Sequence, residues 1–142
     1  MDKEGNEKFY KEIVKTPCPY FKDDIHFSNE GFEHLRFKNY FTPRSNKDSA
    51  MRFSLLPSAI KIINSSHTLQ GFTTRYRFEY RFINSRKERA LLFIKYYEFI
   101  AILNERKMKV IVKQIENGRK SFLSIIPLFK EKTPPIEGDG FS

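Results

Sequence analysis

The second half of the chain alternates apolar and polar residues. In residues 72–82 the aromatic residues Tyr76, Phe78 and Tyr80 take every second position, with arginines and a glutamate between them. A period of two is typical of a β-strand. A further apolar run at 91–103 and the two runs within KVIVKQIENGRKSFLSIIP, residues 109–127, predict three more strands.

The first half shows helical spacing instead. Residues 1–15 form a short amphipathic pattern, and residues 29–38 follow Ser28, a favourable N-cap. Residues 47–65 carry apolar side chains at helical intervals, and Pro57 within them predicts a kink or two consecutive helices. Helices followed by strands predict an α+β fold, with the N-terminal helices packed on one face of a four-stranded antiparallel meander.

We expect a single domain over residues 20–131. An N-terminal segment, residues 1–19, precedes it, and the prolines of Thr16-Pro17-Cys18-Pro19 end the first helix. A flexible tail rich in Pro and Gly, residues 132–142, follows it. Whether the N-terminal segment folds onto the domain or onto a partner is left open by the sequence.

Charge narrows the range of partners. The 142 residues include 26 Lys and Arg against 17 Asp and Glu, a formal net charge of +9. Such an excess favours a polyanion such as RNA, although acidic proteins and acidic membrane surfaces attract the same charge. With no apolar run long enough to span a bilayer, no signal-peptide pattern and one cysteine, we expect a cytoplasmic protein that does not act on membranes.

Several kinds of chemistry lack their motifs. Three scattered His and one Cys do not have the spacing of a zinc site, and six single glycines make no phosphate-binding loop. A nucleophile elbow is also missing from the sequence. We therefore expect neither a metal nor a cofactor.

The hairpin at 109–127 carries polar residues among its apolar ones. A two-residue turn at Asn117-Gly118 would pair Lys113 with Phe122 and Ile111 with Ser124. Lys113, Lys120 and Ser124 would then share one face. The helices would cover the other face: Val110, Val112, Gln114, Ser121, Leu123 and Ile125. The polar face is either a solvated surface or a surface that binds phosphate.

Four segments together resemble a known superfamily. They are HFSNEGFEHL, RFSLLPSAIKIINSS, YYEFIAI and KVIVKQIENGRKSFLSIIP, and the resemblance covers roughly residues 24–127. The arrangement resembles small phage- and mobile-element-borne proteins of the barnase–EndoU–colicin–RelE-like (BECR) ribonuclease superfamily. In this resemblance His34 matches a helix histidine, Ser124 a hydroxyl residue of the last strand, and Lys113 or Arg119 a basic position.

The resemblance implies a toxin or mobile-element effector that cleaves RNA, including tRNA, without a metal, and that an acidic inhibitor protein holds when present. The ribose 2′-OH would attack the adjacent phosphorus while His34 transfers protons, Lys113 stabilises charge and Ser124 donates a hydrogen bond. Five more residues are expected to contact RNA or phosphate: Arg36, Arg52, Arg119, Lys120 and Ser121.

Other interpretations stay open. Similar proteins often carry a His shortly after the Asn-Gly turn where this chain has Ser121, which favours a non-catalytic RNA-binding module. A basic protein that docks onto an acidic partner is a third class. His34 is also placed to pair with Glu30, four residues before it. The aromatic residues of 72–82 either stack on single-stranded RNA or form core, and the pattern favours core.

Overall fold

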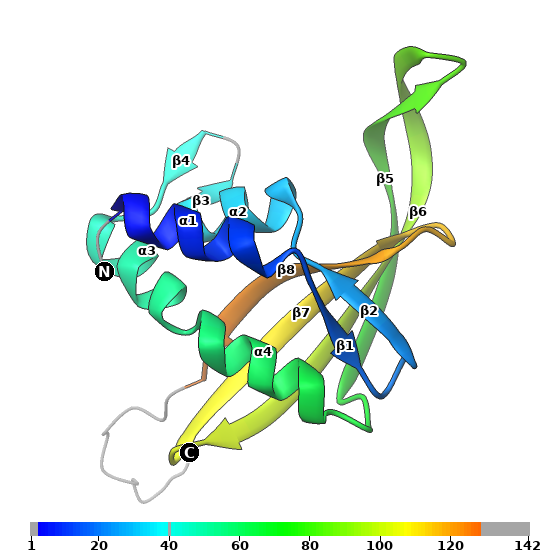
Figure 1. Ribbon diagram of the computed structural model, residues 1–142. Helices are drawn as coiled ribbons and strands as arrows, with labels where there is room; N and C mark the ends of the chain where they lie inside the picture. The colour runs from blue at the N-terminus through cyan, green and yellow to red at the C-terminus, as the bar shows by residue number, and fades with distance from the viewer. Residues whose placement is uncertain (1–2, 40, 129–142) are drawn as a thin grey trace, which may run out of the picture.

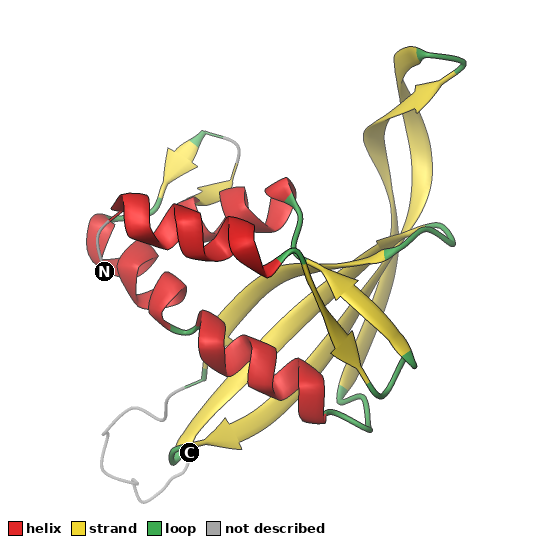
Figure 2. Cartoon of the chain, viewed as in Figure 1, coloured by secondary structure: helices red, strands yellow, loops and turns green. Residues whose placement is uncertain are grey.

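The computed structural model describes residues 3–39 and 41–128 and confirms an α+β fold (Figures 1 and 2). Its helices are α1 (Lys3–Ile13), α2 (Asn29–Arg36), α3 (Asn46–Ser54) and α4 (Leu56–Ser65). Its strands are β1 (Lys15–Cys18), β2 (Asp23–His26), β3 (Phe37–Asn39), β4 (Thr42–Pro43), β5 (Gly71–Ile83), β6 (Arg86–Leu103), β7 (Arg106–Ile115) and β8 (Lys120–Pro127). The expected tail at 132–142 lies outside the described residues.

The main sheet corrects the expected meander. Strands β5 to β8 do run antiparallel to one another, but the sheet has six strands in the order β1-β2-β8-β7-β6-β5. The hairpin β1–β2 extends it, and β2 runs parallel to β8. Pro17, expected only to stop a helix, lies in edge strand β1, where a missing N–H is tolerated. Strands β3 and β4 form a separate two-stranded sheet.

The N-terminal segment belongs to the domain. Tyr10 of α1 is 2% exposed, and its hydroxyl donates to the carbonyl oxygen of Ser28 at 2.7 Å. Its ring packs against Phe27, Phe32 and Phe122. The question that the sequence left open is thus answered for residues 3–18, which supply one helix and one edge strand.

The predicted break near Pro57 is confirmed. Helix α3 ends at Ser54 and α4 begins at Leu56, so the proline lies in the first turn of α4, where its missing N–H costs no hydrogen bond.

Helix α4 then packs across one face of the sheet (Figure 1). Its buried residues are Leu56, Ala59, Ile62 and Ile63, and the sheet contributes Phe99, Met108, Val110, Val112, Phe122 and Ile125. Full burial of each Leu, Ile, Val, Phe or Met side chain among them stabilises the fold by roughly 1.5–3 kcal/mol. No helix in the described part of the chain is long and apolar enough to cross a membrane.

The turn between β7 and β8 differs from the predicted two-residue turn. Residues 116–119 form a longer loop, in which Glu116 adopts a φ of 54°. The backbone N–H of Glu116 donates to the carbonyl oxygen of Phe93, and its carboxylate accepts from the N–H of Phe93. These bonds to β6 hold Glu116 outside the β7–β8 ladder. As a result Lys113 pairs with Ser121, and the predicted pair with Phe122 is wrong.

A β-bulge then restores the register. Ile111 pairs with Ser124 as predicted, while Val112 pairs with Phe122, so Leu123 is the extra residue. The bulge reverses the alternation: Phe122 enters the core, and Leu123, expected under the helices, faces the opposite side. Lys120 pairs with Gln114 and does not share a face with Lys113.

Strands β5 and β6 extend beyond the rest of the sheet. Strand β7 ends opposite Ile94, so the segments 76–83 and 86–93 pair only with each other. This two-stranded segment, the arm, projects away from the helices (Figure 1). Tyr76, Phe78 and Tyr80 on it are 68%, 57% and 67% exposed, and the favoured prediction that they form core is therefore wrong.

Candidate functional site

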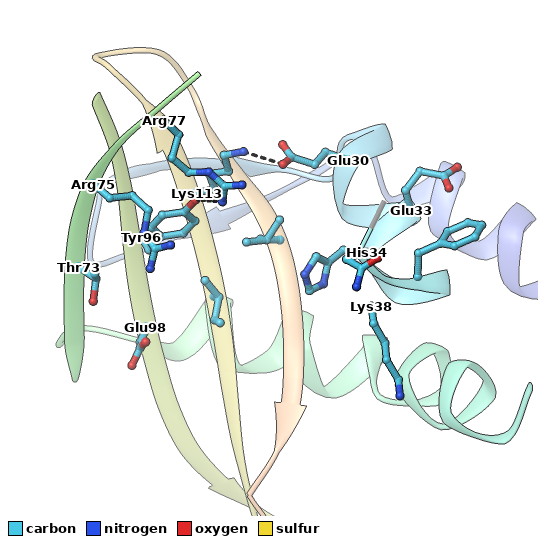
Figure 3. Close-up of a pocket in the computed structure, with 14 residues that line it drawn as sticks. Glu30, Glu33, His34, Lys38, Thr73, Arg75, Arg77, Tyr96, Glu98 and Lys113 are labelled. Carbon is cyan, nitrogen blue, oxygen red and sulfur yellow. Dashed lines mark hydrogen bonds and ion pairs between the residues drawn. The ribbon is translucent and has the colours of Figure 1, made fainter. Parts of the chain in front are cut away.

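A cavity of about 840 Å³ lies between helix α2 and the concave face of the sheet (Figure 3). Helix α2 contributes Glu30, Glu33 and His34, and strand β3 contributes Phe37, Lys38 and Asn39. The main sheet contributes Thr73, Arg75, Arg77, Tyr96, Glu98, Ile111, Lys113 and Leu123. The cavity thus combines cations, carboxylates, a phenol and an imidazole.

Two periodicities bring these side chains together. On α2, Glu30 and His34 lie four positions apart and share one side, and Lys38 of β3 lines the cavity beside them. On the sheet the lining residues recur every second position, and the register places Thr73 beside Tyr96 and Tyr96 beside Lys113. The cavity is therefore the space between one helix face and one strand face.

His34 provides an imidazole directed at the sheet (Figure 3). Its Nδ1 atom is buried and has no hydrogen-bond partner within the described residues. Burial, together with the charges of Arg44 and Arg52, lowers the pKa of His34 below its ordinary value of 6.5. A neutral imidazole at neutral pH can accept a proton. The open pairing of His34 with Glu30 is not formed, because the Glu30 carboxylate contacts Lys113.

Lys113 connects three elements. Its ammonium group is 2.6 Å from the Glu30 carboxylate on α2 and 3.3 Å from the Glu79 carboxylate on β5. Burial by itself would lower the pKa of Lys113, but the hydrogen bond and charge of Glu30, with the charge of Glu79, raise it above its ordinary value. Lys113 is therefore charged at neutral pH and holds α2 against the sheet.

Arg75 and Arg77 are the cavity cations that the sequence did not single out. The Arg75 guanidinium lies 5.5 Å from the centre of the Tyr96 ring, and an Nη1 of Arg77 donates to the Tyr96 hydroxyl at 3.4 Å. Both side chains are exposed and point into the cavity (Figure 3). Their alternation with aromatic residues was visible in the sequence, but the pattern did not show which side would meet α2.

Most of the other predicted site residues lie elsewhere. Ser124 is fully buried and does not line the cavity, and its hydroxyl has no hydrogen-bond partner within the described residues. Arg36 contacts Glu33 and covers the rings of Phe32 and Phe37. Arg52 binds Asp48 and the carbonyl oxygen of Ile125, a contact that joins α3 to β8.

The residues after the hairpin turn are also outside the cavity. Lys120 lies 3.7 Å from the Asp23 carboxylate and over the ring of Phe21. Arg119 is exposed in the loop, and Ser121 pairs with both Lys113 and His26 along the strands. Of the predicted catalytic residues, the structure places His34 and Lys113 in the cavity.

A metal site is not formed by the described residues, since no group of three or more His, Cys, Asp and Glu is arranged to hold an ion there. Comparisons with known protein families, with curated proteins and with solved structures gave no match. The geometry of the cavity is therefore the basis for the function proposed below.

Proposed function

We propose that the protein is a metal-independent endoribonuclease that cleaves RNA in this cavity by attack of a ribose 2′-OH on the adjacent phosphodiester. The observation that carries the proposal is the position of His34. Its imidazole, with a pKa kept low by burial, faces a wall that carries Arg75 and Arg77. A base opposite two guanidinium groups suits a reaction in which a hydroxyl loses a proton and a phosphate gains charge.

Four side chains of the cavity act directly in this scheme: His34, Arg75, Arg77 and Tyr96. His34 accepts the proton of the attacking 2′-OH, and the new O–P bond closes a 2′,3′-cyclic phosphate. Arg75 and Arg77 donate hydrogen bonds to the phosphoryl oxygens, where negative charge increases. Tyr96, whose hydroxyl oxygen accepts from Arg77, donates its proton toward the 5′-oxygen as the P–O bond to it breaks. The products are a cyclic phosphate end and a 5′-hydroxyl end.

Lys113 acts differently from the predicted phosphate ligand. Two carboxylates already occupy its ammonium group, so a phosphate would have to displace Glu30 or Glu79 to bind it directly. The proposal therefore assigns phosphate binding to Arg75 and Arg77, and gives Lys113 the role of holding α2, with His34, at its distance from the sheet.

Cleavage of a defined RNA in EDTA tests the proposal. We expect cyclic phosphate ends with the parent protein and a loss of about 10²–10⁴-fold in rate with His34→Gln. His67→Gln is the matched control, because His67 is an exposed histidine beyond the end of α4. Cleavage that needs a divalent metal, or that is equal in His34→Gln and the parent, would overturn the proposal.

The position of Ser124 favours a second candidate, a non-catalytic RNA-binding module, because this residue is buried away from the cavity. The resemblance adds that Ser121 stands where the BECR superfamily often has a histidine. The module would retain RNA with an affinity that falls steeply with salt and would leave the strand intact. Purified protein that binds RNA but gives no cleavage over a long incubation would favour the module.

A further inference from the structure

The arm carries a surface that the cavity does not use. Because side chains alternate along a strand, odd-numbered residues of β5, such as Arg75 and Arg77, face the cavity, whereas Tyr76, Phe78 and Tyr80 face the opposite side. The register sets Phe93, Leu91 and Arg89 of β6 beside these three aromatic residues. We call this surface, together with Lys87, the aromatic strip.

The aromatic strip is exposed although its residues are large and apolar. Leu91 is 56% exposed, similar to the three aromatic residues of β5. Within the strip Tyr76 and Phe93 pack with ring centres 5.2 Å apart, the Arg89 guanidinium lies 4.5 Å from the Phe78 ring, and Lys87 lies 5.2 Å from the Tyr80 ring. Ring faces and cations are thus interleaved on one side of a two-stranded ribbon.

The glutamates of the two strands lie on one side of the ribbon only. The three glutamates of β5 and β6, namely Glu79, Glu88 and Glu98, all have the parity of the cavity side. The strip side carries Lys87, Arg89 and Lys95. The carboxylate of Glu116 approaches β6, but it accepts the backbone N–H of Phe93. A ribbon side with cations and aromatic rings, from which the glutamates of both strands are absent, is complementary to a stacked polyanion.

We infer that the aromatic strip binds single-stranded polynucleotide, with bases stacked on Tyr76, Phe78 and Tyr80 and phosphates beside Lys87 and Arg89. A second copy of the chain fits the strip less well, because pairing two such surfaces would bring like charges together. The inference deepens the proposed ribonuclease function, on which it rests, by naming the substrate class as unpaired RNA.

Topology connects the strip to the cavity. Strand β5 is the edge of the sheet, so its outer backbone is not covered by another strand of the sheet. Arg77, which lines the cavity, lies between Tyr76 and Phe78 in sequence. The cavity side and the aromatic strip are therefore opposite faces of the same strand, β5. A flexible single strand can pass over this edge from the arginines to the rings, whereas a stiff duplex cannot follow so sharp a path.

Binding of a fluorescent 2′-O-methyl polyuridine strand of about twelve nucleotides to the full chain tests the inference. We expect Tyr76→Thr/Tyr80→Thr to weaken binding about tenfold or more, because base–aromatic stacking is lost. Ile102→Thr is the matched control and should bind like the parent, since Ile102 is equally exposed, at 68%, on β6 but far from the arm. Lys87→Gln/Arg89→Gln should reduce the salt slope by about 1, and Lys61→Gln on α4 should not.

Two results would overturn the inference. The first is an equal affinity of the parent and Tyr76→Thr/Tyr80→Thr for the probe. The second is a parent that sediments as a dimer and a double variant that sediments as a monomer, with the same affinity for the probe. The probe lacks the attacking hydroxyl and cannot be cleaved. If binding of the probe does not depend on the arm while RNA cleavage is intact, this inference alone is overturned. Arm-dependent binding without any cleavage would overturn the ribonuclease proposal alone.

Discussion

Replacing Lys113 by Met tests how the cavity is held together. The substitution keeps an unbranched side chain of similar length in a residue that is 5% exposed, but it removes an ammonium group that contacts two carboxylates. Removing one partner of a fully buried ion pair costs about 3–5 kcal/mol, because a buried charge is left without compensation. Here the Glu30 side chain is 52% exposed and returns to water, whereas that of Glu79 is 23% exposed. We therefore expect a loss of about 2 kcal/mol in the free energy of unfolding.

Second-site variants separate the two carboxylates. If the cost comes from the carboxylate that water reaches least, Glu79→Gln should restore about 1 kcal/mol in the Lys113→Met background, and Glu30→Gln should restore less. This order is the reverse of the contact distances, since Glu30 makes the shorter contact at 2.6 Å. Urea unfolding monitored by circular dichroism, with a double-mutant cycle, measures each step.

Lys109→Met is the control for this experiment. Lys109 lies on the same side of β7, four residues from Lys113, and meets Glu98 at 3.7 Å with both side chains about one quarter exposed. We expect a loss of about 1 kcal/mol or less. Equal losses in Lys113→Met and Lys109→Met, or better rescue by Glu30→Gln than by Glu79→Gln, would refute the reasoning.

Three further predictions concern other parts of the fold. Gly31→Ala should destabilise the protein by about 1–3 kcal/mol in urea unfolding, because the added Cβ would clash with the backbone oxygen of Phe122. An unchanged midpoint would contradict this close packing of α2 on β8. Arg52→Gln should lower the midpoint of thermal unfolding, because its hydrogen bond to the carbonyl oxygen of Ile125 is lost, and should leave the affinity for RNA near the parent value. A loss of RNA affinity without a loss of stability would instead assign Arg52 to the RNA-binding site. In an NMR titration the pKa of His34 should lie below 6.5, and the free energy of unfolding should fall as the pH falls through that lowered pKa. A pKa above 6.5 would contradict the role of burial.

The pH dependence of Lys113 has the opposite sign. Because the folded state raises the pKa of Lys113 above its ordinary value of 10.5, its contribution to stability is fully present below that value. The contribution is lost as pH rises through the raised pKa. The stability difference between the parent and Lys113→Met should therefore be constant near neutrality and shrink in strong alkali. A difference that already falls between pH 7 and 9 would contradict this linkage.

The helix side of the cavity was predictable from local spacing. Glu30 and His34, four positions apart in the predicted helix, both line the cavity from one side of α2. Lys38 also lines it, but from strand β3, since the helix ends at Arg36. Arg75 and Arg77 were likewise recognised as one side of a strand. The sequence did not show that this side of α2 faces this side of β5, because that depends on where α2 packs relative to the sheet.

The hairpin shows where local rules were insufficient. An Asn-Gly pair favours a two-residue turn, but bonds from Glu116 to Phe93 on a third strand extend the loop, and a bulge at Leu123 compensates. Each change alters strand parity by one residue, so Phe122 and Leu123 exchange sides while Ile111 still pairs with Ser124. The partner that decides the turn is 23 residues away and does not appear in a local pattern.

By itself the sequence determined the types of the long elements, the two-helix break at Pro57, the helix face that carries His34 and the excess of positive charge. These depend on spacing, proline geometry and residue counts within a short window of chain. Tertiary structure alone decided that β1 and β2 join the sheet, that Lys113 is held by two carboxylates, and that the aromatic residues of β5 remain exposed. Each of these depends on contacts between distant segments, because a strand's alternation states which residues share a side but not what will cover it.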